Sequence, residues 1–250
     1  MSARQTPHSS QRKRPPRASA APRVSAVIAD LRRLGSAKVR AGMVRYAIPS
    51  DKAFGVSVGA IRKLAKSLGK SHELAAALWE SGWYEARMLA AFVDEAERVT
   101  PAQMDRWRGD FDNWAICDTL CFHLFDRTPH ALGRVRAWSR LKGEYDRRAA
   151  FALLASVAAH DRALEDAELA DCLPLIERAA DDDRNFVKKG VSWALRVVGR
   201  RSRRLHEDSV ALARRLSESD DPAARWIGRD ALRDLSKPAV VRRLKSGAVG

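Results

Sequence analysis

The stretch FDNWAICDTLCFHLF, residues 111–125, combines an apolar run with a tryptophan and a carboxylate four positions apart, Trp114 and Asp118. Residues at this spacing lie on one face of a helix. A carboxylate is rarely buried without a partner. Asp118 therefore caps a helix that begins at Thr119, pairs with a basic residue such as Arg148, or belongs to a site. In a site, a fixed carboxylate can act as a general base or stabilise a developing positive charge.

Basic residues recur at similar places in three later segments of the chain. Each segment has an acidic or polar start, then a basic residue, then small and large apolar residues in a helical period. The segments are YDRRAAFALLASV (145–157), NFVKKGVSWALRVV (185–198) and DPAARWIGRDALRDL (221–235). Their basic anchors, Arg148, Lys189 and Arg225, are 41 and 36 positions apart, and EARMLAAFV with Arg87 is a weaker earlier copy. A repeat of this length predicts stacked helix pairs.

Helical periodicity predicts an all-α fold. Apolar residues recur at i, i+3, i+4 and i+7 in segment after segment, and strand-type alternation is nearly absent. Thr100-Pro101 and Asp221-Pro222 indicate helix starts. The period and the sequence DPAARWIGRDAL resemble HEAT-type repeats. We therefore expect residues 24–250 to form a single HEAT-like helical-repeat solenoid, an α-α superhelix whose basic anchors line its concave face.

The charge balance predicts an acidic partner, with nucleic acid as the first candidate. The 250-residue chain has 46 Lys and Arg against 31 Asp and Glu, a net charge of +15. Residues 1–23 hold six basic residues and no acidic one, which leaves +9 on residues 24–250. These first residues are rich in Ser, Pro and Arg, so we expect a disordered basic N-terminal tail, with a mitochondrial transit peptide as the alternative.

The sequence predicts no membrane span, no metal and no cofactor. No apolar stretch approaches the roughly 20 residues that a bilayer requires. Cys117 and Cys121 lie one helical turn apart near His123, but no second ligand pair follows, so small core residues are favoured over zinc ligands. The odd cysteine number favours a reducing compartment. Phosphate-binding glycine loops, HExxH and GxSxG motifs are not found.

Five motifs together resemble those of a known family. They are FGVSVGAIRKLAKSLGK (54–70), EARMLAAFV (85–93), DNWAICD (112–118), RRAAFALL (147–154) and FVKKGVSWALR (186–196). No single motif is diagnostic. Their order and spacing over residues 25–245 are similar to those of the bacterial HEAT-like DNA alkylation-repair glycosylases of the AlkD type.

This resemblance implies excision of cationic N3- and N7-alkylated purines from DNA. The family's tryptophan and catalytic aspartate fall on Trp114 and Asp118, its arginine in the next repeat on Arg148, and a second tryptophan on Trp193. A cationic base is a good leaving group, so Asp118 would stabilise the oxocarbenium-like sugar and orient water. Trp114 and Trp193 would flank the cationic nucleoside. Arg148 would hold a phosphate and fix the register.

Further DNA contacts are expected from basic residues of the later repeats, Arg147, Lys188, Lys189 and Arg225. In the structural alternative, the basic anchors pair with aspartates of neighbouring loops and only lock the repeats, and the lysines or Arg147 face solvent. Trp114 and Trp193 could likewise be core residues, as we expect for the remaining tryptophans.

The sequence therefore predicts a metal-free, monofunctional DNA-alkylpurine N-glycosylase. We expect it to act as a monomer on alkylated double-stranded DNA in the bacterial cytoplasm, associated with the nucleoid. The alternatives are a non-catalytic scaffold that binds distorted DNA or RNA, and a solenoid that binds an acidic protein. Only the Trp114–Asp118 pair separates the enzyme from these, because a carboxylate on a DNA-facing wall lowers affinity and requires a reason.

Overall fold

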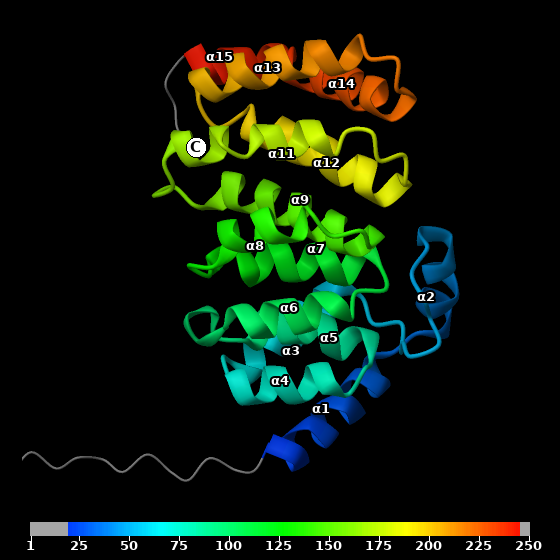
Figure 1. The fold of residues 1–250 in the computed structure, drawn as a ribbon. Helices are drawn as coiled ribbons and strands as arrows, with labels where there is room; N and C mark the ends of the chain where they lie inside the picture. Colours follow the sequence, from blue (N-terminus) through cyan, green and yellow to red (C-terminus); the bar gives the residue numbers. More distant parts are fainter. Residues whose placement is uncertain (1–19, 246–250) are drawn as a thin grey trace, which may run out of the picture.

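The helices of a computed structural model, which describes residues 20–245, stack one above another along the chain (Figure 1). Residues 20–245 contain no β-strand, and the predicted all-α repeat solenoid is confirmed. The predicted basic tail, residues 1–23, lies outside the described residues except for its last four, which belong to the first helix. Between residues 20 and 245, no helix is both long and apolar enough to cross a bilayer.

Two layers of helices make up the stack. In the first layer, each helix packs on the next, and we call it the site layer. Its members are α3 (Val58–Leu68), α5 (Tyr84–Val93), α7 (Trp114–His123), α9 (Glu144–His160), α12 (Asn185–Val198) and α14 (Pro222–Leu235). The second layer covers it and consists of α1 (Ala20–Leu34), α4 (His72–Glu80), α6 (Pro101–Gly109), α8 (Ala131–Trp138), α10 (Asp166–Ala170), α11 (Leu173–Arg178) and α13 (Arg203–Ser217). Short 3-10 turns, η2 (Ala96–Arg98) and η3 (Phe125–Arg127), join helices, and α15 (Pro238–Lys245) ends the stack.

Side-chain caps start the helices where the sequence predicts them. The Thr100 hydroxyl accepts a hydrogen bond from the Gln103 backbone N–H at 3.2 Å, and an Asp221 oxygen accepts one from the Ala224 N–H at 2.8 Å. In both cases proline follows the cap, where its missing N–H costs nothing. Helix boundaries in this chain are therefore determined locally.

Stacked indoles join neighbouring helices of the second layer. Trp79 of α4 and Trp107 of α6 are fully buried and stack with 4.4 Å between ring centroids. The Trp79 indole N–H donates to an Asp110 oxygen at 2.7 Å, which satisfies its polar atom. Trp138 is buried as well, as expected for a core residue, but the same expectation is wrong for Trp226, whose side chain is exposed. Burial of each such ring contributes on the order of 2 kcal/mol.

Helix α9 lies between α7 and α12 and is almost entirely buried. Its buried residues are mostly small or aliphatic, and Arg148 is the one charged residue among them. The alanines allow the flanking helices to approach closely. As a result, side chains of α7 and α12 can meet across α9, and Arg148 lies between them.

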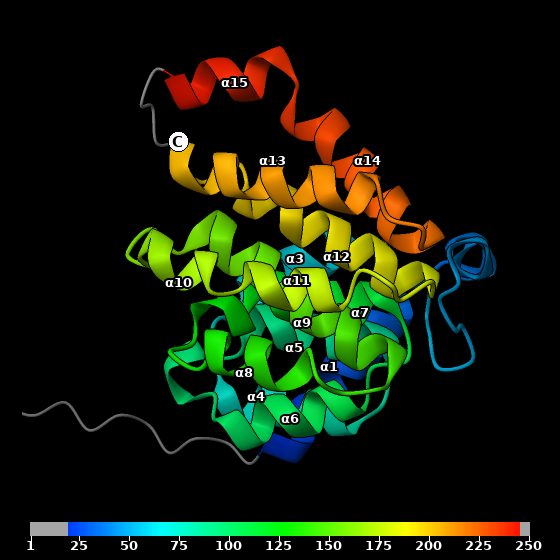
Figure 2. The ribbon, with the colours of Figure 1, turned by 45° about the horizontal axis from the view of Figure 1, so that its top comes forward.

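A segment near the N-terminus stands apart from the layers (Figures 1 and 2). It comprises α2 (Ala37–Gly42), η1 (Met43–Tyr46) and the loop that follows. We call residues 43–56 the strap. The buried Glu85 carboxylate accepts hydrogen bonds from the backbone N–H groups of residues 54, 55 and 56 at 2.7–3.1 Å, and the Tyr84 N–H donates to the Lys52 carbonyl at 2.8 Å. The start of α5 therefore holds the strap in place.

Candidate nucleic-acid interface

Helix α7 presents Trp114, Asp118 and Phe122 along one face, since they are spaced four residues apart. The helix begins at Trp114, and the Asn113 side chain caps it by accepting from the Ile116 N–H at 3.0 Å. Asp118 therefore lies inside the helix and is not the cap of a helix that begins at Thr119. That alternative is wrong, and a pairing partner or a site explains the carboxylate.

Arg148 of α9 binds Asp118 through both carboxylate oxygens. Its Nε donates to Oδ1 at 2.9 Å and its Nη2 to Oδ2 at 2.6 Å, while its Nη1 donates to the Phe186 carbonyl at 2.9 Å. The Asp118 side chain is 21% exposed and that of Arg148 is 8% exposed. The pair is thus largely buried, but the carboxylate is not sealed from solvent.

The surroundings act on the proton affinity of Asp118 in opposite directions. Burial raises the pKa of Asp118 above its ordinary value, and the charge and hydrogen bonds of Arg148 oppose this rise. A guanidinium stays charged at all accessible pH values, and a two-pronged contact favours the ionised carboxylate. The arrangement is an anion held in a poorly solvated position, where its field acts strongly on a nearby positive charge.

A surface hollow of about 440 Å³ opens on the Arg148 side of this pair, and Asp118 itself is not among the residues that line it. Trp114, Arg148, Phe186 and Lys189 line it, together with residues 45–47 of the strap. The Trp114 indole N–H donates to the Tyr46 carbonyl at 2.7 Å, so the strap is fixed to the indole. Lys189 is exposed, and within residues 20–245 its ammonium has no recorded hydrogen bond or ion pair. An exposed ammonium at the edge of a hollow can form an ion pair with a phosphate group of a bound ligand.

Charged residues occupy matching positions in all six site-layer helices. They are the fourth or fifth residues of α3, α5, α7, α9, α12 and α14, namely Arg62, Arg87, Asp118, Arg148, Lys189 and Arg225. Five of the six are basic, and Asp118 is the exception. A carboxylate in such a row weakens the attraction of the surface for a polyanion. Asp118 therefore requires an explanation other than attraction of a polyanion.

Trp193 lies on α12 outside the hollow and stacks on Phe122 of α7, with 5.9 Å between ring centroids and 20° between ring planes. The His160 ring also meets the edge of Phe122, at 4.2 Å. Both Trp114 and Trp193 are partly exposed and pack against buried residues at the edge of the core. The α7 face thus has an indole at one end and an aromatic cluster at the other.

The structure does not bring the other predicted DNA contacts into the hollow. Arg147 donates to Asp182 at 2.8 Å and to the Leu141 carbonyl at 3.0 Å. Lys188 lies 5.2 Å from the centre of the Trp226 ring. Arg225 donates to the Ser219 and Asp220 carbonyls of the loop before its own helix. These three side chains are engaged with neighbouring parts of the protein.

Several residues in or near the hollow were not predicted from the sequence. Phe122 could have been found by extending the four-residue spacing from Asp118. Phe186 precedes the two lysines of α12, but no local pattern points its ring or carbonyl at Arg148. Arg45 and Tyr46 carry no sequence signal, because only the path of the strap brings them to α7.

A metal site has no basis in the described part of the chain. No group of three or more His, Cys, Asp or Glu side chains between residues 20 and 245 is arranged to hold an ion. Cys117, Cys121 and Cys172 are free thiols and all three are buried.

Comparison with known proteins agrees with the motifs. A family model described as DNA alkylation repair enzyme matches residues 27–235. The chain belongs to the DNA alkylation repair enzyme family. This membership confirms the resemblance inferred from the sequence.

The fold of this DNA alkylation repair family member also has a solved counterpart. It is a protein from a family related to the HEAT-like repeat DNA glycosylases, described as having affinity for branched DNA structures. The TM-score is 0.72 with 18% identity, and the match covers 91% of this chain and 96% of the other. At this identity the likeness concerns the fold. Comparison with curated proteins gave no match.

Proposed function

We propose that the protein is a monofunctional DNA glycosylase that excises cationic N3- and N7-alkylated purines by hydrolysing the N-glycosidic bond. One observation carries this proposal. Asp118, the single acid in the row of charged residues on the site layer, is held in a largely buried ion pair on the same helix face as the Trp114 indole. An anion at this position weakens attraction for DNA, so DNA binding alone does not require it.

The chemistry requires an anion more than a proton donor. As the bond from C1′ to the cationic purine breaks, the bonding electrons neutralise the base and positive charge grows on the deoxyribose. The Asp118 carboxylate stabilises that charge electrostatically. Water then adds to C1′, and its proton passes to the carboxylate or to solvent. The products are the neutral alkylated base and an abasic site.

The neighbouring residues have separate roles in this scheme. Arg148 already uses three of its five N–H groups within the protein, so its main role is to position Asp118. Two exposed cations, Arg45 and Lys189, line the hollow, and Lys189, in the row of charged residues, would take the phosphate contact. The Trp114 face would attract the cationic nucleoside, and Trp193 with Phe122 would form the aromatic end of the same surface.

The second candidate is a non-catalytic protein that binds distorted or branched DNA. The solved counterpart is described in these terms. The closed contact between Asp118 and Arg148 also fits a structural bridge that joins α7 to α9. This candidate predicts DNA binding without any release of alkylated bases.

Replacing Asp118 with asparagine tests both candidates. Asp118→Asn should reduce the single-turnover release of 7-methylguanine by about 10²-fold or more, the scale of losing one key electrostatic group. DNA affinity should be retained or should rise, because a negative charge is lost. Asp105→Asn is the matched control: Asp105 of α6 is also paired with an arginine, Arg134 of α8. Undiminished release by Asp118→Asn would remove the catalytic role, and no release by the unaltered protein would favour the second candidate.

A further inference from the structure

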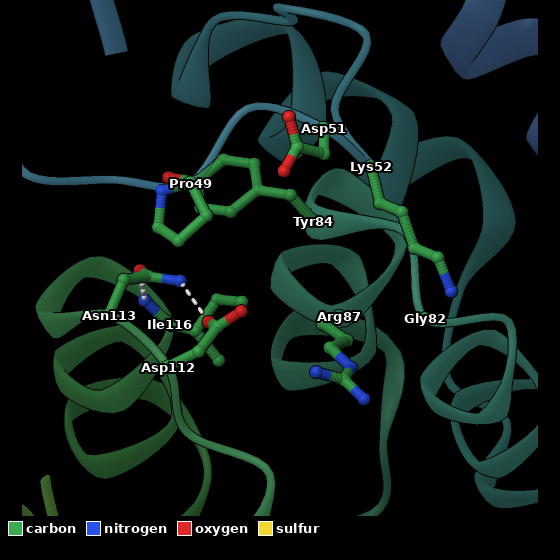
Figure 3. A pocket seen from close by; sticks show the side chains of 9 residues that line it. All are labelled: Pro49, Asp51, Lys52, Gly82, Tyr84, Arg87, Asp112, Asn113 and Ile116. Carbon is green, nitrogen blue, oxygen red and sulfur yellow. Dashed lines mark hydrogen bonds between the residues drawn. The ribbon is translucent and has the colours of Figure 1, made fainter. Parts of the chain in front are cut away.

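A second cavity, of about 380 Å³, lies on the other side of the α7 start, between α5, α7 and the strap (Figure 3). Pro49, Asp51 and Lys52 of the strap line it, together with Tyr84, Arg87 and Asp112. We call it the α5–α7 cavity. Its volume falls within the range of about 300–1,000 Å³ that is usual for ligand pockets.

Arg87 and Asp112 lie on opposite sides of this cavity without pairing with each other (Figure 3). Arg87 contacts Asp110 instead: its Nη1 donates to the Asp110 carbonyl at 3.3 Å, and its Nη2 lies 3.6 Å from an Asp110 carboxylate oxygen. Its buried Nε has no partner within residues 20–245. One Asp112 oxygen accepts from the Asn113 side-chain amide at 2.6 Å. A donor and an acceptor that face each other across a gap can both be satisfied by one ligand with complementary edges.

The remaining walls supply an apolar surface and further donors. The Pro49 and Tyr84 rings and the Ile116 side chain provide the apolar contacts. Burial, together with the charges of Glu85 and Asp112, raises the pKa of Tyr84 to about 12, so its hydroxyl remains a neutral donor. Planar ligands are held by such a combination of rings and a few directed polar groups.

The charge pattern excludes several ligand classes. Asp51 and Asp112 would repel a phosphate, and Lys52 and Arg87 would repel a cation. A neutral group with an amino donor at one position and a carbonyl oxygen acceptor at another suits all four. Guanine and cytosine carry both an exocyclic amino group and a carbonyl oxygen, whereas thymine has no amino group. Carboxylates accept from base amino groups, and arginine donates to base acceptors.

The α5–α7 cavity and the hollow are both lined by residues at the start of α7. Asn113 lines the cavity and Trp114, the next residue, lines the hollow. The strap spans both, with residues 45–47 at the hollow and Pro49, Asp51 and Lys52 at the cavity. DNA that crosses the start of α7 would therefore meet two separate recesses.

We propose that the α5–α7 cavity binds an unpaired guanine or cytosine base of DNA lying across α7, with Asp112 and Arg87 reading opposite edges of the base. This inference rests on the proposed function only in that the ligand belongs to DNA. The hollow beside Arg148 takes the damaged nucleotide, and the cavity takes a base that has lost its partner.

The test compares the binding of three labelled duplexes by fluorescence anisotropy at one salt concentration. One duplex is fully paired, one has a single bulged guanine, and one has a single bulged thymine. The unaltered full-length protein should bind the guanine bulge at least about fivefold more tightly than the thymine bulge, the lower bound for one good base contact. Asp112→Asn should bring this ratio close to one and leave affinity for paired DNA within about twofold. Asp112 is exposed, so the fold tolerates the change.

Two further variants sharpen the result. Tyr84→Phe removes one hydroxyl and should also lower the ratio. Lys38→Met on α2 removes an exposed charge outside the cavity and should leave the ratio unchanged. A ratio of one in the unaltered protein, or a ratio that survives Asp112→Asn, would overturn the inference even if 7-methylguanine is still released. If the protein releases no 7-methylguanine but still prefers the guanine bulge in a way that depends on Asp112, the proposed glycosylase activity is overturned. The assignment of the cavity as a base-binding site then stands.

Discussion

Replacing Arg148 with methionine should leave the Asp118 carboxylate in place without its partner. Methionine is long enough to retain much of the packing of the arginine stem within α9. Both oxygens of Asp118 lose their hydrogen bonds, at 2.9 and 2.6 Å in the intact pair. Only 21% of the Asp118 side chain is exposed, so water replaces these contacts incompletely. The variant should therefore be clearly less stable than the unaltered protein.

The size of the loss follows from the burial of the pair. Removing one partner of a buried ion pair costs about 3–5 kcal/mol, and the partial exposure of Asp118 favours the lower end, about 3 kcal/mol. For a domain of this size, that corresponds to a fall in Tm of about 6–12 °C. Removing both charges, in Arg148→Met with Asp118→Leu, leaves no unpaired buried charge and should recover most of the loss.

Urea unfolding followed by circular dichroism at pH 7 measures the four members of this cycle. Arg203→Met is the control, because its partner Glu207 and Arg203 itself are 65% and 83% exposed. That change should cost less than about 1 kcal/mol. The reasoning is refuted if Arg148→Met loses less than about 1 kcal/mol, or if the double variant loses the sum of the two single losses.

Two other predictions concern DNA binding and pH. Lys189→Ala should lower the steepness of log affinity against log salt concentration by about 0.9, the value for one phosphate contact. Lys188→Ala should change this slope less, because the Lys188 ammonium of the unaltered protein lies over the Trp226 ring. Equal slopes for both variants would contradict the assignment of Lys189. Base release needs ionised Asp118, whose pKa is raised by burial, so single-turnover release should fall as the pH drops through a midpoint above the ordinary aspartate value of about 3.9. In Arg148→Met this midpoint should move to still higher pH, because the influence that lowers the pKa of Asp118 is lost; a midpoint that stays fixed or moves down would count against the pairing.

Much of the fold could be predicted because it depends on local pattern. Apolar spacing of three and four residues indicated helices, Thr100-Pro101 and Asp221-Pro222 marked helix starts, and the recurrence of basic anchors indicated stacked repeats. The alignment of Trp114 with Asp118 is also local, since residues four apart in a helix must share a face.

The sequence by itself thus determined the helices, their repetition, the basic surface and the one acid within it. Tertiary structure alone decided which basic side chains are paired within the protein and which can contact a ligand. Arg147 is paired with Asp182 and Arg148 with Asp118, whereas Lys189 forms no hydrogen bond or ion pair within residues 20–245, although all three are basic residues near the start of a site-layer helix. These pairings join residues about 30 or more positions apart, so they depend on how far each helix is shifted and rotated against the next. The strap over Trp114 and the cavity beside it arise in the same way, from contacts between distant segments that no local periodicity records.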